Sequence, residues 1–255
     1  MKGRWADGVA LGFLLLLLAG WMGGGDGQVD LVNRLQAPSW THPFGTDELG
    51  RDLLRRWWAG GARSLSLGAG LTAFHLAAGF ALALAAEGRT WAKGCLLAGA
   101  DLLAAIPATL LALLLLALLR PGLGSLLAAL ALGGWIPYAR ICLNRLEVLR
   151  QDPSLAQAHL LGAGRGHILL RHLFPRLWPL LWAQASVGLG AVVLVEGGLS
   201  FLGVGLPPEQ ASWGGMLGTA RAFFLVSPWP LLWPSAGLLG LLLALGRSRG
   251  REPGW

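Results

Sequence analysis

The chain has 255 residues, of which 55% are hydrophobic and only 13% are charged. A soluble domain of this size could not cover so much apolar surface with polar side chains, so the composition excludes a soluble globular protein and predicts an all-α integral membrane protein. The net charge of +7 comes almost entirely from arginines that flank apolar runs, which is typical of membrane-interface residues and not of a nucleic-acid-binding patch.

Six apolar stretches have about the length of 20 residues that a membrane-spanning helix needs. They are roughly Trp5–Gly24, Ser64–Ala86, Cys95–Leu119, Leu123–Leu143, Leu177–Leu199 and Pro228–Gly246. The first stretch follows two basic residues and could be a secretory signal peptide, but no small-x-small cleavage site is obvious after it. We expect six transmembrane helices with an uncleaved first helix, and a cleaved signal is the alternative.

The distribution of basic residues predicts the orientation in the membrane. One side comprises the N-terminus, Glu87–Gly94, Asn144–Arg176 and the tail after Gly246, and together with Arg140 it holds 13 of the 20 lysines and arginines. Positive charge favours the cytoplasmic side, so both termini are expected to be cytoplasmic. Tryptophans at or near the span ends are typical of an interfacial aromatic belt: Trp91, Trp135, Trp178, Trp182, Trp229 and Trp233.

Two loops are longer than simple connections require, and they divide the chain. We expect an N-terminal transmembrane helix at 1–24, an outer segment at 25–61 and a five-helix core at 62–250 that contains an inner loop at 144–176. Within the inner loop, Asp152 followed by proline predicts a helix start, and Gly162 predicts its end. A second short helical turn, His167–Leu173, is expected to stop at Pro175.

The sequence contains no motif for ATP binding, because neither lysine follows a glycine-rich phosphate loop and no Gly-x-Gly-x-x-Gly pattern occurs. Ser200 lies in a Gly-x-Ser pattern that resembles an intramembrane serine nucleophile, but no histidine follows His172 to act as its base. The two cysteines and five histidines show no metal-ligand spacing. We therefore expect no catalytic residue, no metal and no cofactor in this chain.

A few polar residues and prolines fall inside or near the predicted spans. His75 is expected to bond a backbone carbonyl as a neutral imidazole, although an intramembrane ionisable group is also a functional hypothesis. Asp101 and Glu196 lie near span ends, where we expect helix capping and interfacial hydrogen bonding, with pore lining as the alternative. Pro107 and Pro137, within the third and fourth spans, can kink their helices, although proline is also common in membrane helices that have no such role.

Several segments, in order along the chain, resemble the dipeptide/oligopeptide/nickel family of ABC-transporter permeases, and most closely its C-type subunit. These segments are His42–Arg56 with Gly61–Leu65, Trp135–Arg140, Leu155–Ala163 with Ile168–Pro175, and Glu196–Gly205 with Pro207–Pro208 and Ser212–Met216. The third pair resembles the cytoplasmic "EAA" loop of these permeases. Ala156 and Gln157 stand where the family has a glutamate and its first alanine, whereas Ala158, Gly162 and Pro175 match.

The resemblance implies an ABC importer permease fold whose cytoplasmic coupling helix docks on an ATPase. The implied coupling residues are Asp152, Ala156, Gln157, Ala158, Gly162, Arg171, His172 and Pro175. The outer signature comprises Gly45, Thr46, Asp47, Gly50, Arg51 and Asp52, and the fifth-helix signature comprises Glu196, Ser200, Phe201 and Gly203. The resemblance leaves the substrate-binding residues unknown.

The implied function is the transmembrane permease subunit of an ATP-driven importer in the inner membrane of a prokaryote. It implies a second permease subunit, two cytoplasmic ATPase subunits that bind ATP and Mg²⁺, an extracytoplasmic solute-binding protein and membrane lipid as partners, and no nucleic acid. The solute is peptide-like or nickel-type. An intramembrane serine hydrolase using Ser200 and a membrane scaffold without a pore are the competing readings.

Overall fold

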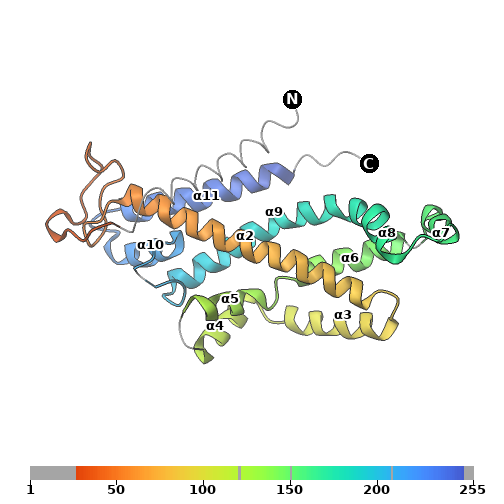
Figure 1. The fold of residues 1–255 in the computed structure, drawn as a ribbon. Helices are drawn as coiled ribbons and strands as arrows, with labels where there is room; N and C mark the ends of the chain where they lie inside the picture. The colour runs from red at the N-terminus through yellow and green to blue at the C-terminus, as the bar shows by residue number, and fades with distance from the viewer. Residues whose placement is uncertain (1–26, 120–121, 150, 208, 250–255) are drawn as a thin grey trace. The chain divides into compact units, whose positions relative to one another are not determined.

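The computed structural model describes residues 27–119, 122–149, 151–207 and 209–249, and this part of the chain is helical without a β-strand (Figure 1). The α-helices are α2 (Leu53–Ala86), α3 (Thr90–Ala104), α4 (Ala108–Leu118), α5 (Leu123–Ala131), α6 (Ile136–Leu149), α7 (Pro153–Leu160), α8 (Arg165–Ile168), α9 (Phe174–Phe201), α10 (Trp213–Ala220) and α11 (Trp229–Arg249). Three short segments complete the order: η1 (Leu31–Asn33), the π-helical η2 (Leu169–Leu173) and η3 (Arg221–Phe223). The all-α prediction is confirmed for the described residues.

The helices are distributed over two compact units. One unit contains the described residues up to Leu71, those between Ala108 and Leu130, and those from Leu189 onward. The other contains Thr72–Pro107 and Ala131–Gly188, and therefore holds α3, α6, α7, α8 and η2. The long helices α2 and α9 each contribute one part to either unit.

Four helical stretches in the described residues are long and apolar enough to cross a membrane: Leu53–Ala86, Leu123–Leu149, Gly166–Phe201 and Trp229–Gly246. The pair α3 and α4 makes a fifth if the two helices form one broken span. These five stretches coincide with the second to sixth predicted spans. The first predicted span, and with it the segment 1–24, lies outside the described residues.

The third predicted span is not a continuous helix. It is bent by 83° between Ala104 and Ala108, immediately around Pro107. Proline has no backbone N–H and disfavours a helical conformation in the residue before it, so α3 ends ahead of Pro107 and α4 begins after it. The predicted kink is confirmed, and it is a full break.

Two other prolines each stand second in a helix. Pro137 is the second residue of α6, directly after the break that follows the end of α5 at Ala131. Pro175 is the second residue of α9, so the prediction that it stops a short helix was wrong. At Pro137 the missing N–H costs no intrahelical hydrogen bond. Pro175 follows a π turn in which the Phe174 N–H donates to the Leu169 carbonyl, and the helical stretch continues through it.

Much of the segment predicted as the inner loop, 144–176, is helical. Helix α6 continues to Leu149, because Leu143, Leu146 and Leu149 recur at helical spacing and are all buried. At the other end, α8, η2 and α9 form one helical stretch from Gly166. Only α7 and the turns on either side of it therefore remain between the two spans.

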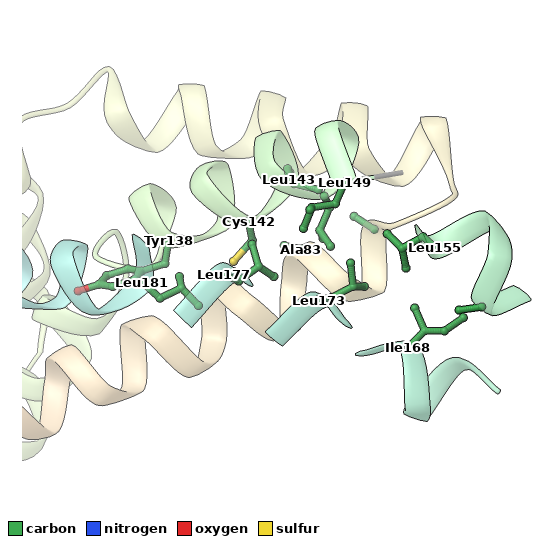
Figure 2. Close-up of a cluster of buried hydrophobic side chains, with 13 residues drawn as sticks. Ala83, Tyr138, Cys142, Leu143, Leu149, Leu155, Ile168, Leu173, Leu177 and Leu181 are labelled. Atoms are coloured by element: carbon green, nitrogen blue, oxygen red, sulfur yellow. The ribbon is translucent and has the colours of Figure 1, made fainter. Parts of the chain in front are cut away.

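The second unit is built around an apolar cluster that joins α2, α6, α7 and α9. Figure 2 shows side chains from each of these helices meeting in it, with Ala83 from α2, Cys142 from α6, Leu155 from α7 and Leu177 from α9. Cys142 and Leu177 are fully buried. Leu155 lies on α7, between the spans, and burial of a leucine side chain contributes about 1.5–3 kcal/mol relative to exposure to water. The cluster thus anchors the short helix α7 to the longer ones.

Candidate functional site

The outer signature forms a compact turn structure ahead of α2. Gly45 and Gly50 have φ values of +83° and +74°, which residues with a Cβ rarely adopt. A Cβ at Gly45 would also lie 2.4 Å from the carbonyl oxygen of Gln36, and one at Gly50 would lie 1.7 Å from that of Asp30. Both glycines are therefore required by backbone contact as well as by φ.

The polar residues of this signature are hydrogen-bonded to one another and to the turn. Asp47 accepts N–H groups from Leu49 and Arg51, each at 2.9 Å, and the Arg51 Nε at 2.7 Å. Arg56 adds its Nε at 3.2 Å from the same carboxylate, which is 4% exposed. A buried carboxylate with two guanidinium partners is satisfied in charge and geometry, so these residues hold the outer segment in one conformation.

The remaining outer residues start helix α2. Thr46 is completely buried, donates to the Asn33 carbonyl at 2.5 Å and accepts the Gln36 N–H at 2.8 Å. Asp52 accepts the Arg55 N–H at 3.0 Å, which is an N-cap bond, and its second oxygen lies 2.8 Å from His42 Nδ1. The structure thus brings all six residues of the outer signature together.

An aromatic cluster packs against the start of α2 in the same unit. Phe44 stacks on Trp233 with ring centroids 3.9 Å apart, and the Trp233 indole N–H donates to the Phe44 carbonyl at 3.1 Å. Trp57 donates to the Trp233 carbonyl, and Trp213 donates to that of Trp57. Trp233 is therefore a packing residue of this cluster, whereas Trp91, Trp178 and Trp182 are exposed; the interfacial belt stays a prediction.

The fifth-helix signature contains a buried carboxyl group. Glu196 is 1% exposed, and it accepts the hydroxyl of Ser200 at 2.7 Å and that of Ser64 from α2 at 3.1 Å. These bonds satisfy both carboxyl oxygens and tie α2 to α9. Of the two roles expected for Glu196, hydrogen bonding and helix capping, the structure shows hydrogen bonding between two helices.

The geometry does not favour a serine nucleophile at Ser200. Ser200 is 5% exposed and its hydroxyl donates to Glu196, and its hydrogen-bond partners in the described residues include no histidine. An activated serine needs a base that accepts its proton and an accessible oxygen. The hydrolase reading therefore finds no support here.

The same signature also ends α9. Gly203 has a φ of +84°, and the N–H groups of Gly203 and Val204 donate to the carbonyls of Ser200 and Leu199 at 3.0 Å each. This is the pattern of a left-handed glycine C-cap. Phe201, the last residue of α9, lies under the Arg221 guanidinium at 5.2 Å from its ring centroid.

Two polar residues of the second unit, His75 and Asp101, contact residues of other helical spans. The buried His75 ring packs on Gly134, since a Cβ there would lie 2.1 Å from the ring, and Gly134 belongs to the break between α5 and α6. Asp101 forms an ion pair with Arg140, so it joins α3 to α6 and does not cap a helix. The described residues contain no group of three metal-ligating side chains.

The inner loop carries the capped helix that its sequence predicts. The Oδ1 atom of Asp152 accepts the Ser154 N–H at 2.8 Å, and α7 begins at Pro153. Hydrogen bonds from Ser154 and Arg176 lower the pKa of Asp152 to about 2, so this side chain is a carboxylate at neutral pH. The predicted N-cap is confirmed.

The predicted end of α7 is confirmed as well. Gly162 has a φ of +80°, and the Ala163 N–H donates to the Ala158 carbonyl at 3.0 Å, as in a Schellman turn. A Cβ at Gly162 would meet no atom within 4 Å. The glycine is thus needed for its backbone conformation, and the space beside it is open in the isolated chain.

The other predicted coupling residues fall on either side of this turn. Ala156, Gln157 and Ala158 are all on α7, where Gln157 is exposed and Ala158 is buried in the apolar cluster. Arg171 is exposed and His172 partly exposed, and both lie in the π-helical segment ahead of Pro175. Leu160 and Leu161 at the end of α7 are each 87% exposed, and Leu170 in the π-helical segment is 70% exposed.

One contact of the inner loop could not be predicted from the sequence. Arg176, at the start of α9, forms an ion pair with Asp152, and its second terminal nitrogen donates to the Ser154 hydroxyl at 3.2 Å. The two charged residues are 24 positions apart, and no local pattern connects them. They meet because the turn after α7 and the helical stretch from Gly166 reverse the chain direction.

Comparison with known proteins gives a family for this architecture. Residues 76–247 match the family model described as the binding-protein-dependent transport system inner membrane component. A peptide permease protein of Brucella suis is 35% identical over 236 residues, which cover 91% of this chain and 78% of that protein.

Two further relatives represent other named transport systems. The dipeptide transport system permease protein of Alkalihalophilus pseudofirmus is 33% identical over 83% of this chain and 70% of its own length. The nickel transport system permease protein of Escherichia coli K12 is 31% identical over 92% of this chain and 86% of its own length. With the family model matched over most of the chain, this protein belongs to the binding-protein-dependent transport system inner membrane components, among the permeases of the dipeptide, oligopeptide and nickel group.

Proposed function

We propose that the chain is one permease subunit of an ATP-driven importer that receives a peptide-like or nickel-type solute from an extracytoplasmic binding protein. The relatives are named as permeases of peptide, dipeptide, oligopeptide and nickel transport systems, which supports this class of solute. The permease pairs with a second permease subunit, and two cytoplasmic ATPase subunits bind ATP and Mg²⁺. It spans the inner membrane six times with both termini in the cytoplasm.

The observation that carries this proposal is helix α7, a short helix placed between two apolar spans. It is capped at Asp152, ended by Gly162 and anchored through Leu155 and Ala158 in the apolar cluster. Its outward side presents Gln157 and the exposed Leu160. Exposed leucines on a fixed helix are typical of a protein-docking surface, and this supports the docking of α7 on an ATPase subunit.

The charge around α7 supports a cytoplasmic position for it. The stretch Asn144–Arg176 carries five arginines and only two acidic residues. Short basic loops between spans face the cytoplasm in multi-pass membrane proteins. The ATPase-docking side and the positive side of the permease therefore coincide in the proposed orientation.

Co-purification and transport together test the proposal. The chain is co-expressed with a second permease, ATPase and binding-protein subunits from the same organism, and the complex is reconstituted into vesicles. We expect the ATPases to co-purify with it, and ATP to drive uptake of a labelled dipeptide or of radioactive nickel. A chain that purifies without ATPase subunits, or vesicles that take up neither probe, would contradict the proposed function.

A further inference from the structure

A closed ring of polar contacts connects the start of α7 with the start of α9. Asp152 uses one carboxylate oxygen to cap α7 through the Ser154 N–H at 2.8 Å and the other to bind Arg176. Arg176 completes the ring by donating to the Ser154 hydroxyl at 3.2 Å. The guanidinium thus holds the cap residue and the first turn of α7 at the same time.

The rest of the support for α7 is apolar and does not fix its direction. A helix of eight residues is not stable alone in water, so α7 depends on tertiary contacts. Leu155 and Ala158 bury their side chains near Ile168 and Leu173 in the cluster of Figure 2. Hydrophobic contact is non-directional, whereas a planar guanidinium with two acceptors has a defined geometry.

We propose that Arg176 is a positioning residue that fixes the orientation of α7 relative to the first turn of α9. Through this ring, a displacement of α7 moves the start of α9, and α9 continues into a membrane span. The inference rests on the proposed function in one respect, namely that a partner ATPase is what displaces α7.

The alternative is that the pair is an ordinary surface ion pair. The side chains of Arg176 and Asp152 are 37% and 31% exposed, and pairs of this exposure contribute little to the stability of a protein. Loss of the pair should therefore leave the protein inserted and abundant on either reading. Only the positioning role predicts a change in the orientation of α7 and in coupling.

Two variants break the ring without removing the cap. Asp152→Asn keeps an oxygen that accepts the Ser154 N–H, because asparagine is as good an N-cap as aspartate, but it loses the charge that binds Arg176. Arg176→Gln removes the guanidinium and leaves Asp152 unchanged. The matched control is Lys93→Gln, which breaks a 2.6 Å ion pair with Glu147 in the same unit, where the side chains are 34% and 63% exposed.

Distance measurement on the purified full chain tests the orientation directly. Spin labels are placed at Gln157→Cys on α7 and Trp182→Cys on α9, both exposed, in a background in which Cys95 and Cys142 are replaced. We expect Asp152→Asn and Arg176→Gln each to broaden the distance distribution, and Lys93→Gln to leave it unchanged. Equal distributions in all variants would overturn the inference.

Transport in the reconstituted complex tests the coupling. We expect Asp152→Asn and Arg176→Gln to lower the labelled dipeptide or nickel imported per ATP hydrolysed by about two- to fivefold, as loss of a partly exposed ion pair shifts an equilibrium. The double variant should be no worse than either single one, because both remove the same contact. Unchanged import per ATP in both variants would contradict the inference. A wild-type complex that imports neither probe, while the distances broaden as expected, would refute the proposed function and retain the positioning role.

Discussion

Replacing Gly162 with valine tests whether the turn after α7 carries the docking function. At a φ of +80°, a residue with a Cβ costs about 1–2 kcal/mol relative to glycine. A Cβ there meets no atom within 4 Å, so the chain itself adds no steric term to this cost. A penalty of this size lowers the population of the observed turn by about 5- to 30-fold relative to other conformations. The observed turn is the one in which Leu160 and Leu161 are exposed beside α7.

The same backbone penalty can be placed elsewhere as a control. Gly88 has a φ of +77° in the turn between α2 and α3, so Gly88→Val carries a similar strain away from α7. Gly164→Val adds the same volume in open space, at a glycine whose φ lies outside the left-handed region. Gly88→Val shows what backbone strain at a turn does by itself, and Gly164→Val shows what added volume near α7 does by itself. A defect seen only in Gly162→Val is therefore due to a changed direction of α7.

The assay compares membrane abundance, ATPase co-purification and uptake in reconstituted vesicles. We expect Gly162→Val to insert at normal abundance but to lose uptake and the stimulation of ATPase activity by solute, whereas both control variants keep them. Asp152→Ala, which loses a cap worth about 1 kcal/mol, should show the same defect more mildly. Wild-type coupling in Gly162→Val, or an equal loss in Gly88→Val, would refute the reasoning that this turn directs the docking helix.

Three further predictions address topology and packing. The exposed Cys95 should resist a membrane-impermeant thiol reagent in intact cells, whereas Gln36→Cys in the outer segment should react; the reverse labelling would invert the proposed orientation. Gly214→Ala should lower the unfolding temperature by overpacking worth about 1–3 kcal/mol, because its Cβ would lie 2.3 Å from the Gly197 carbonyl oxygen, while Gly198→Ala in open space should not. Glu196→Ala leaves two buried serine hydroxyls without their acceptor and should destabilise by about 1–3 kcal/mol per group in thermal unfolding, and an unchanged midpoint would contradict this role.

Features that depend on local sequence could be predicted without a structure. Apolar length locates the spans, because a helix in lipid must satisfy its backbone internally over about 20 residues. The cap at Asp152 and the left-handed turn at Gly162 follow from residue types that satisfy helix ends within a few positions. The outer signature was found by resemblance, and its glycines at 45 and 50 are explained by close backbone contacts that only the structure reveals.

Features that depend on contacts between distant residues were decided by the tertiary structure. Pro175 was expected to end a helix, but the π turn before it and its place in the first turn of α9 let one helical stretch pass through. The contacts of Trp233 are a second case, because Phe44 of the outer segment stacks on its ring and accepts its indole N–H. The Asp152–Arg176 pair is of the same kind: neither residue specifies the other locally, and they meet only because the chain folds back after α7, which no periodicity or cap signal encodes.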